Sequence, residues 1–158
     1  MKQMISKILA SALVLFGVSV AAAAEEDPIY TGLFNNRAVG GYDTVAYFTE
    51  GKPVKGEKKF STEYMGANWR FSSQENLDLF LADPAKYAPQ YGGYCAWAMA
   101  GGEKGERPYG ASGDPKQWEI VDGKLYLNYD ASVKEDWLKD IPGFISKANT
   151  FYPQFVGE

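Results

Sequence analysis

The sequence predicts an α+β fold, a small single domain of two β-hairpins with short helices packed against them. Two pairs of strand-like segments are separated by the two-residue turns Met65-Gly66 and Asp122-Gly123, which predict hairpins. Ser-x-x-Glu capping boxes begin at Ser72 and Ser132 and predict a helix after each hairpin. The chain has 158 residues with 46% hydrophobic and 15% aromatic content, which is typical of one globular domain.

Charge and composition exclude several classes of function. The formal net charge is −4, and no cluster of Lys and Arg stands clear of acidic residues, so nucleic-acid binding is not expected. The chain contains no histidine, which excludes Ser-His-Asp catalysis and histidine metal sites. It contains one cysteine, Cys95, so neither an internal disulfide nor a four-thiolate metal site can form.

The segment 1–24 has the pattern of a cleaved secretory signal peptide. Two lysines precede the apolar segment 8–20, which is too short to cross a bilayer, and the alanines at 21–24 follow it. We therefore expect the segment 1–24 to be removed and the segment 25–158 to form the exported domain, periplasmic or extracellular and free of the membrane after cleavage.

In the exported part, a turn at Gly40-Gly41 leads into a short strand or helical turn, and the first hairpin follows. Its strands are predicted over residues 59–64 and 67–71, where aromatic and polar residues alternate. Phe60, Trp69 and Phe71 are expected to face the core.

The helix after this hairpin should start with Ser72 as its N-cap, in a capping box with Glu75. Its end is predicted at Asp83-Pro84, because the residue before a proline disfavours helix. Its buried face should carry Leu77, Phe80 and Leu81, which recur at spacings of three and four.

The second hairpin is predicted over residues 118–121 and 124–129, and two helices should follow it. The first, over residues 133–140, starts from the Ser132 capping box and turns Trp137 and Leu138 inward. The last should span residues 143 to about 149 before Pro153 ends regular structure. Its buried side is expected to carry Phe144, Ile145 and Ala148.

Residues 64–87 resemble the YHS domain family, whose pattern has Tyr-His-Gly at a hairpin turn, two cysteines and a closing Asn/Asp-Pro-x-x-Tyr. The segments 41–48, 87–96 and 122–128 are similar to the exported branch of that family. The resemblance implies metal binding, copper in particular, through the cysteines of the family. Here the turn histidine is replaced by Met65, the first cysteine by Ser72 and the second by Asn76.

Cys95 is the main candidate for the functional residue. Gly92-Gly93 allow a sharp turn and a short helix-favouring run follows, so Cys95 should lie at a helix start, where the helix dipole stabilises a thiolate. Met99 lies four residues on and would share its face, and a thiolate with a thioether suits Cu(I). Met65 could supply a third sulfur.

Three interpretations of Cys95 remain open. It could bind a soft metal ion, most of all Cu(I). The protein would then handle copper or protect against it, and it would not be a catalyst. It could be a catalytic redox thiol that works with a thiol from a partner, or it could simply be core packing in a structural or ligand-binding module.

A pocket around Cys95 is a further expectation. The glycine-rich segment 101–110 is expected to form a loop beside the cysteine that could act as a lid. The candidate pocket residues are Tyr42, Asp43, Tyr91, Tyr94 and Trp97.

Overall fold

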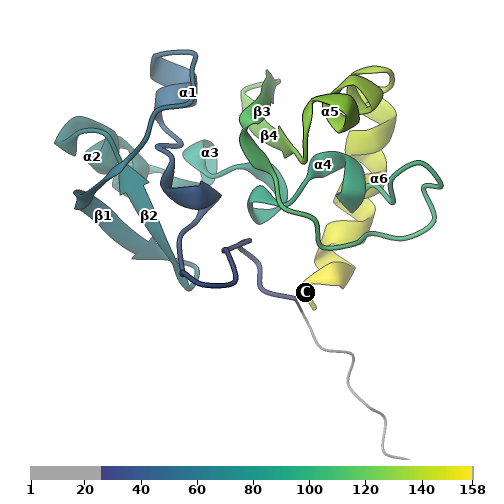
Figure 1. Cartoon of the computed structure of the whole chain (residues 1–158), viewed down its shortest axis with the longest axis horizontal. Helices are drawn as coiled ribbons and strands as arrows, with labels where there is room; N and C mark the ends of the chain where they lie inside the picture. Colours follow the sequence, from purple (N-terminus) through teal and green to yellow (C-terminus); the bar gives the residue numbers. More distant parts are fainter. Residues whose placement is uncertain (1–25, 158) are drawn as a thin grey trace, which may run out of the picture.

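The computed structural model describes residues 26–157 and divides into two halves (Figure 1). The first half holds one two-stranded antiparallel sheet, β1 with β2, and the second half holds another, β3 with β4. The predicted α+β class of two hairpins with short helices is therefore confirmed. The first half contains η1 (Val39–Gly41), α1 (Ala46–Thr49), β1 (Glu57–Tyr64), β2 (Ala67–Phe71), α2 (Gln74–Ala82) and α3 (Pro84–Tyr87). The second half contains η2 (Gln90–Gly93), α4 (Ala96–Met99), β3 (Asp114–Val121), β4 (Lys124–Asn128), α5 (Ala131–Leu138) and α6 (Ile141–Phe155).

Both hairpins turn where the sequence predicts. Met65-Gly66 and Asp122-Gly123 each have positive φ at both residues, as a type I′ turn requires. Strand β2 then alternates buried and half-buried residues, which places Trp69 and Phe71 in the core as predicted. Phe60 is partly buried and packs against the same core.

The two predicted capping boxes are wrong by one and two residues. Helix α2 is capped by Ser73, whose hydroxyl oxygen accepts from the Asn76 amide at 3.1 Å. Ser72 belongs to a different network: its amide and hydroxyl donate to the buried Asp43 carboxylate, and its oxygen accepts from the Asn76 side chain.

Helix α5 is likewise capped by Asp130, which accepts from the Val133 amide at 2.9 Å. Ser132 instead donates its hydroxyl to that carboxylate, since a carboxylate is the stronger acceptor. Two predicted core residues are also exposed, Leu81 at 55% and Leu138 at 46%. Each lies directly beside a deeply buried neighbour, Phe80 or Trp137, and the short helix has only one face against the core.

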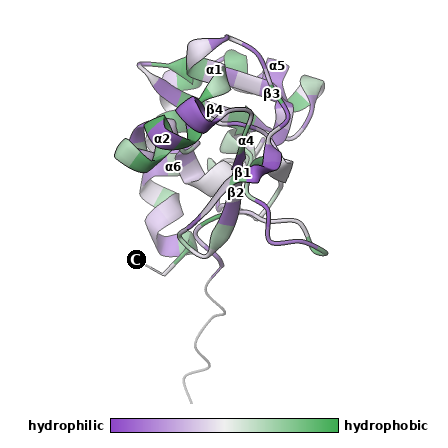
Figure 2. Cartoon of the chain, turned by 90° about the vertical axis from the view of Figure 1, so that its left-hand side faces the viewer, coloured by the Kyte–Doolittle hydropathy of each residue, from purple (hydrophilic) through white to green (hydrophobic). Residues whose placement is uncertain are grey.

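Helix α6 is longer than the predicted segment 143–149 and continues through Pro153, where the sequence predicts its end. A proline removes one helical hydrogen bond, so contacts outside the helix must hold its last turn. The Tyr152 hydroxyl supplies one by donating to the Pro28 carbonyl at 2.6 Å. Figure 2 shows hydrophilic and hydrophobic colours on both α2 and α6, as expected of helices with one face against the core.

Strand β4 lies between two hydrophobic cores. Leu125 and Leu127 face the first core, which contains Trp69, Phe71 and Phe80. Between them, Tyr126 faces the second core, which includes Trp137 and Met99. Because successive side chains of a strand point to opposite sides, this one strand joins the two halves.

The predicted signal peptide, the segment 1–24, lies outside the described residues and stays a prediction. Within residues 26–157, no helix has the length and apolarity needed to cross a bilayer.

Candidate functional site

Cys95 lies at the junction of η2 and α4, as the N-cap residue of α4. Its amide donates to the Ala111 carbonyl at 2.8 Å, and its carbonyl accepts from the Met99 amide at 2.9 Å. It also forms an isolated parallel bridge with Leu127 of β4. The predicted position at a helix start is therefore confirmed, and the backbone that carries the thiol is fixed on both sides.

The Cys95 side chain is fully buried, and this decides its protonation. Burial raises the pKa of the thiol above its ordinary value, although the backbone amides of Ala98, Tyr129 and Trp97 oppose this. The sulfur lies 3.7 Å from the Asn128 side-chain oxygen, to which the neutral thiol can donate. At neutral pH the resting group is consequently the thiol and not the thiolate.

Cys95 forms the floor of a cavity of about 220 Å³, which we call the Cys95 cavity. Its walls are aromatic rings and methyl groups, with no acidic or basic side chain. The cavity therefore offers one soft donor, the sulfur, in a largely apolar setting. It is lined by Cys95, Trp97, Ala98, Tyr109, Ala111, Tyr129 and Val133.

Two tyrosines form the outer part of the Cys95 cavity. Tyr109 is 47% exposed and Tyr129 is 54% exposed, so the cavity reaches the surface between them. Tyr109 comes from the predicted loop 101–110, and burial together with the nearby Cys95 raises the pKa of its hydroxyl. Because Cys95 is fully buried, a ligand must displace neighbouring side chains to touch the sulfur, and the half-exposed Tyr109 and Tyr129 lie at the outer end of the cavity.

Of the five pocket residues predicted from the sequence, Trp97 lines the Cys95 cavity. Tyr91 is buried and donates its hydroxyl to the Asn149 side chain at 3.0 Å. Tyr94 lines a different pocket with Glu26 and Asp27, and burial and these acids raise its pKa to about 12. Tyr42 lies under the Lys55 ammonium group, whose nitrogen is 4.4 Å from the ring centre.

The two methionines proposed as ligands lie in different places. Met99 is fully buried in the second core, one helical turn from Cys95. Met65 is 45% exposed at the β1–β2 turn, where it lines a separate small pocket with Asn36 and Ala67. Figure 1 shows that hairpin in the opposite half of the molecule from α4.

The last predicted pocket residue, Asp43, belongs to a buried hydrogen-bond network. Its carboxylate is fully buried and accepts five hydrogen bonds at 2.7–3.2 Å. One oxygen accepts from the amides of Val45 and Ala46, which start α1. The other accepts from the amide and hydroxyl of Ser72 and from the Asn76 side chain. This network ties α1 to the start of α2.

Five cavity residues were missed by sequence reasoning: Ala98, Tyr109, Ala111, Tyr129 and Val133. Tyr109 could have been found, because it lies in the glycine-rich loop expected beside the cysteine. Tyr129 and Val133 follow β4, far along the chain from Cys95, and only the pairing of Cys95 with Leu127 brings them there.

The fold and the site together define a small two-hairpin α+β domain. It carries a cavity lined by a cysteine thiol and a hydrogen-bond network around a buried carboxylate. Comparison with protein families finds that residues 45–91, which include the first hairpin, match the YHS domain. The predicted resemblance to the YHS domain family is therefore confirmed over these residues. This domain is associated with metal binding, copper in particular. No curated protein and no solved structure matches the chain significantly.

The family's metal site does not fit the residues found here. Ser72 and Asn76, at the positions of the two family cysteines, are hydroxyl and amide side chains already bonded to Asp43. Within residues 26–157, no three Cys, His, Asp or Glu side chains come together as a metal cluster. Among the described residues, the soft donors are the thiol of Cys95, just beyond the matched segment, and the thioethers of Met65 and Met99.

Proposed function

We propose that the protein is an exported, non-catalytic YHS-type protein that binds a soft metal ion, Cu(I) in the first instance, at Cys95. The observation that carries this proposal is the Cys95 cavity, in which the single thiol of the chain lies beneath aromatic walls. A lone sulfur without carboxylate or imidazole neighbours favours Cu(I) over harder ions.

Burial of the thiol favours a metal ligand over a redox nucleophile. The raised pKa leaves little thiolate at neutral pH, and the thiolate is the form that attacks disulfides or peroxides. A bound metal ion displaces the proton of the thiol that coordinates it. The raised pKa of Cys95 therefore opposes metal binding much less than it opposes nucleophilic attack.

Cu(I) needs at least one further donor besides Cys95, and Met99 is our candidate. Its amide already bonds to the Cys95 carbonyl at 2.9 Å, so the two residues are joined across one helical turn. The thioether lies in the second core and would have to change rotamer to reach the cavity. The methionine side chain is flexible enough for this.

Competition titration with a chromogenic Cu(I) chelator tests the proposal. Cys95→Ala should lower the affinity by at least about 100-fold, and Met99→Leu by about tenfold, because each removes a sulfur donor. Met65→Leu is the matched control and should change the affinity less than about twofold. Equal copper uptake by the wild type and a folded Cys95→Ala variant would end the proposal.

The redox alternative has its own measurement, the pH dependence of Cys95 alkylation. Burial raises the pKa of the Cys95 thiol in the folded protein, so the thiol holds its proton more tightly when the chain is folded. This proton binding stabilises the folded state at low pH, and the stabilisation is lost as pH rises through the pKa of the folded state. The native alkylation midpoint should therefore lie above that of the urea-unfolded chain, which should be about 8.5. A native midpoint below that of the unfolded chain would instead support a reactive redox thiol.

A further inference from the structure

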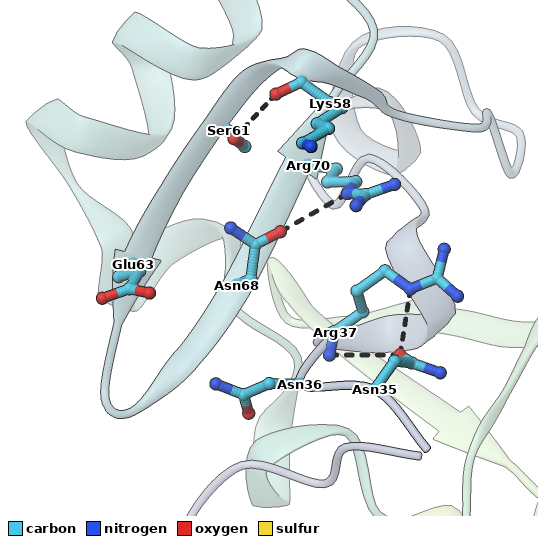
Figure 3. Close-up of a pocket in the computed structure, with 8 residues that line it drawn as sticks. All are labelled: Asn35, Asn36, Arg37, Lys58, Ser61, Glu63, Asn68 and Arg70. Carbon is cyan, nitrogen blue, oxygen red and sulfur yellow. Dashed lines mark hydrogen bonds between the residues drawn. The ribbon is translucent and has the colours of Figure 1, made fainter. Parts of the chain in front are cut away.

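A second site lies on the outer face of the first hairpin, far in sequence from Cys95. The chain before η1 runs along the edge of β2, with the Asn68 amide bonded to the Asn36 carbonyl at 2.7 Å and the Ala38 amide to the Asn68 carbonyl at 3.0 Å. On the other side of β2, Ser61 of β1 pairs with Arg70. Three neighbouring extended segments thus present one continuous polar face (Figure 3).

This face encloses a pocket of about 480 Å³, which we call the arginine pocket. It contains three basic side chains, Arg37, Lys58 and Arg70, against one acidic side chain, Glu63. Figure 3 shows Glu63 at the end away from both arginines. The lining residues are Asn35, Asn36, Arg37, Lys58, Ser61, Glu63, Asn68 and Arg70.

Both arginines are oriented by neighbouring asparagines. The Arg37 Nε donates to the Asn35 side-chain oxygen at 2.9 Å, and the Arg70 Nε donates to that of Asn68 at 3.4 Å (Figure 3). Within the described part of the chain, the terminal nitrogens of both guanidinium groups have no hydrogen-bond acceptor. These outer N–H groups are the ones that bind an oxyanion in a fork-like geometry.

Both arginine side chains of the pocket pass over Gly41. A Cβ at this position would lie 3.6 Å from the Arg37 Cδ and 3.7 Å from the Arg70 Cδ, so both side chains cross the same glycine. Its φ of +81° is also in the region that favours glycine. Among residues 26–157, none of Arg37, Lys58 and Arg70 forms an ion pair. Their positive charges therefore lie close together without a protein counter-ion.

We infer that the arginine pocket binds the phosphate group of a small phosphomonoester. Two oriented guanidinium groups, an ammonium group and asparagine amides supply the donors that such a dianion needs. Glu63 at the far end would repel a longer polyanion but can accept from a hydroxyl group of the same ligand. This inference is independent of the copper proposal, because it uses neither Cys95 nor its cavity.

Calorimetric titration of the protein with inorganic phosphate and with glycerol 3-phosphate tests this inference. We expect binding in the millimolar range or tighter, and at least a tenfold loss for Arg37→Gln and for Arg70→Gln. Arg107→Gln, which lies outside the pocket, should change the affinity less than about twofold. Absence of binding at millimolar ligand, or an equal loss in the Arg107→Gln control, would overturn the inference.

Two exposed residues keep the test decisive if an arginine variant does not fold. Lys58→Gln should weaken phosphate binding about threefold, and Glu63→Gln should strengthen it by a similar factor, because one removes an attraction and the other a repulsion. Stronger phosphate binding by Lys58→Gln, or weaker binding by Glu63→Gln, would overturn the inference.

A phosphate group could also come from a lipid, so vesicles of phosphatidylglycerol form a separate arm of the experiment. Leu33 and Phe34, just before the pocket residues, are 93% and 97% exposed and could insert into a membrane. Our inference predicts that the vesicles bind no more tightly than glycerol 3-phosphate. Vesicle binding that glycerol 3-phosphate does not displace, and that Leu33→Ser with Phe34→Ser abolishes, would overturn it.

Discussion

Replacing Asp43 by alanine is expected to lower the free energy of unfolding by about 4 kcal/mol, because five donors lose the buried carboxylate that accepts from them. Those donors are the amides of Val45, Ala46 and Ser72 and the side chains of Ser72 and Asn76. Asp43→Asn keeps the shape but turns an NH₂ group toward these donors, so we expect a loss of about 2–3 kcal/mol.

Urea denaturation measures both Asp43 variants, with Asp78→Asn as the matched control. Asp78 is exposed on α2, where its carboxylate accepts from the Gln74 side chain. A change at such a surface position should alter stability by less than about 0.5 kcal/mol. If Asp43→Asn were as stable as the wild type, the network would not hold α1 against the start of α2. The same result would also mean that the Ser72 and Asn76 side chains are not held by Asp43.

Gly92→Ala is expected to lower stability by about 3–5 kcal/mol, combining a backbone penalty with a steric clash. Gly92 has a φ of +60°, and an added Cβ would overlap the Pro28 carbonyl oxygen and lie 2.8 Å from its carbonyl carbon. The Gly92 carbonyl also accepts from the Tyr30 amide at 3.0 Å. The clash can be relieved only by moving the segment around Pro28 away from η2.

Gly51→Ala is the control for this prediction. Gly51 has a similar φ of +66° but nothing within 4 Å of an added Cβ. Only the backbone penalty of about 1 kcal/mol therefore applies. Thermal unfolding by calorimetry should show a clearly larger loss for Gly92→Ala. Equal losses for the two variants would mean that the segment around Pro28 is not packed against η2.

Much of the fold follows from local sequence patterns. Both type I′ turns were predictable, because Met65-Gly66 and Asp122-Gly123 lie between alternating strand residues. Errors arose where a distant residue competes for a local group. Ser72 fits a capping box, but Asp43, far earlier in the chain, takes its hydroxyl. Pro153 normally ends a helix, but a hydrogen bond from Tyr152 to Pro28 fixes the turn around it.

The candidate sites were less predictable than the fold. The position of Cys95 at a helix start could be predicted from Gly92-Gly93 and the residues that follow. Its pairing with β4 could not be predicted from the sequence. Arg37 and Arg70 come together only because the chain before η1 pairs with β2, a contact that no local pattern predicts. Neither the burial of the thiol nor the arginine pocket could therefore be derived from spacing alone.

X-ray absorption at the copper K-edge tests the central claim most directly. The protein loaded with one equivalent of Cu(I) should show sulfur bound directly to copper, and this contribution should disappear or fall sharply in Cys95→Ala. A copper environment of nitrogen and oxygen alone, or sulfur ligation that persists in Cys95→Ala, would contradict the assignment of Cys95 as the metal ligand.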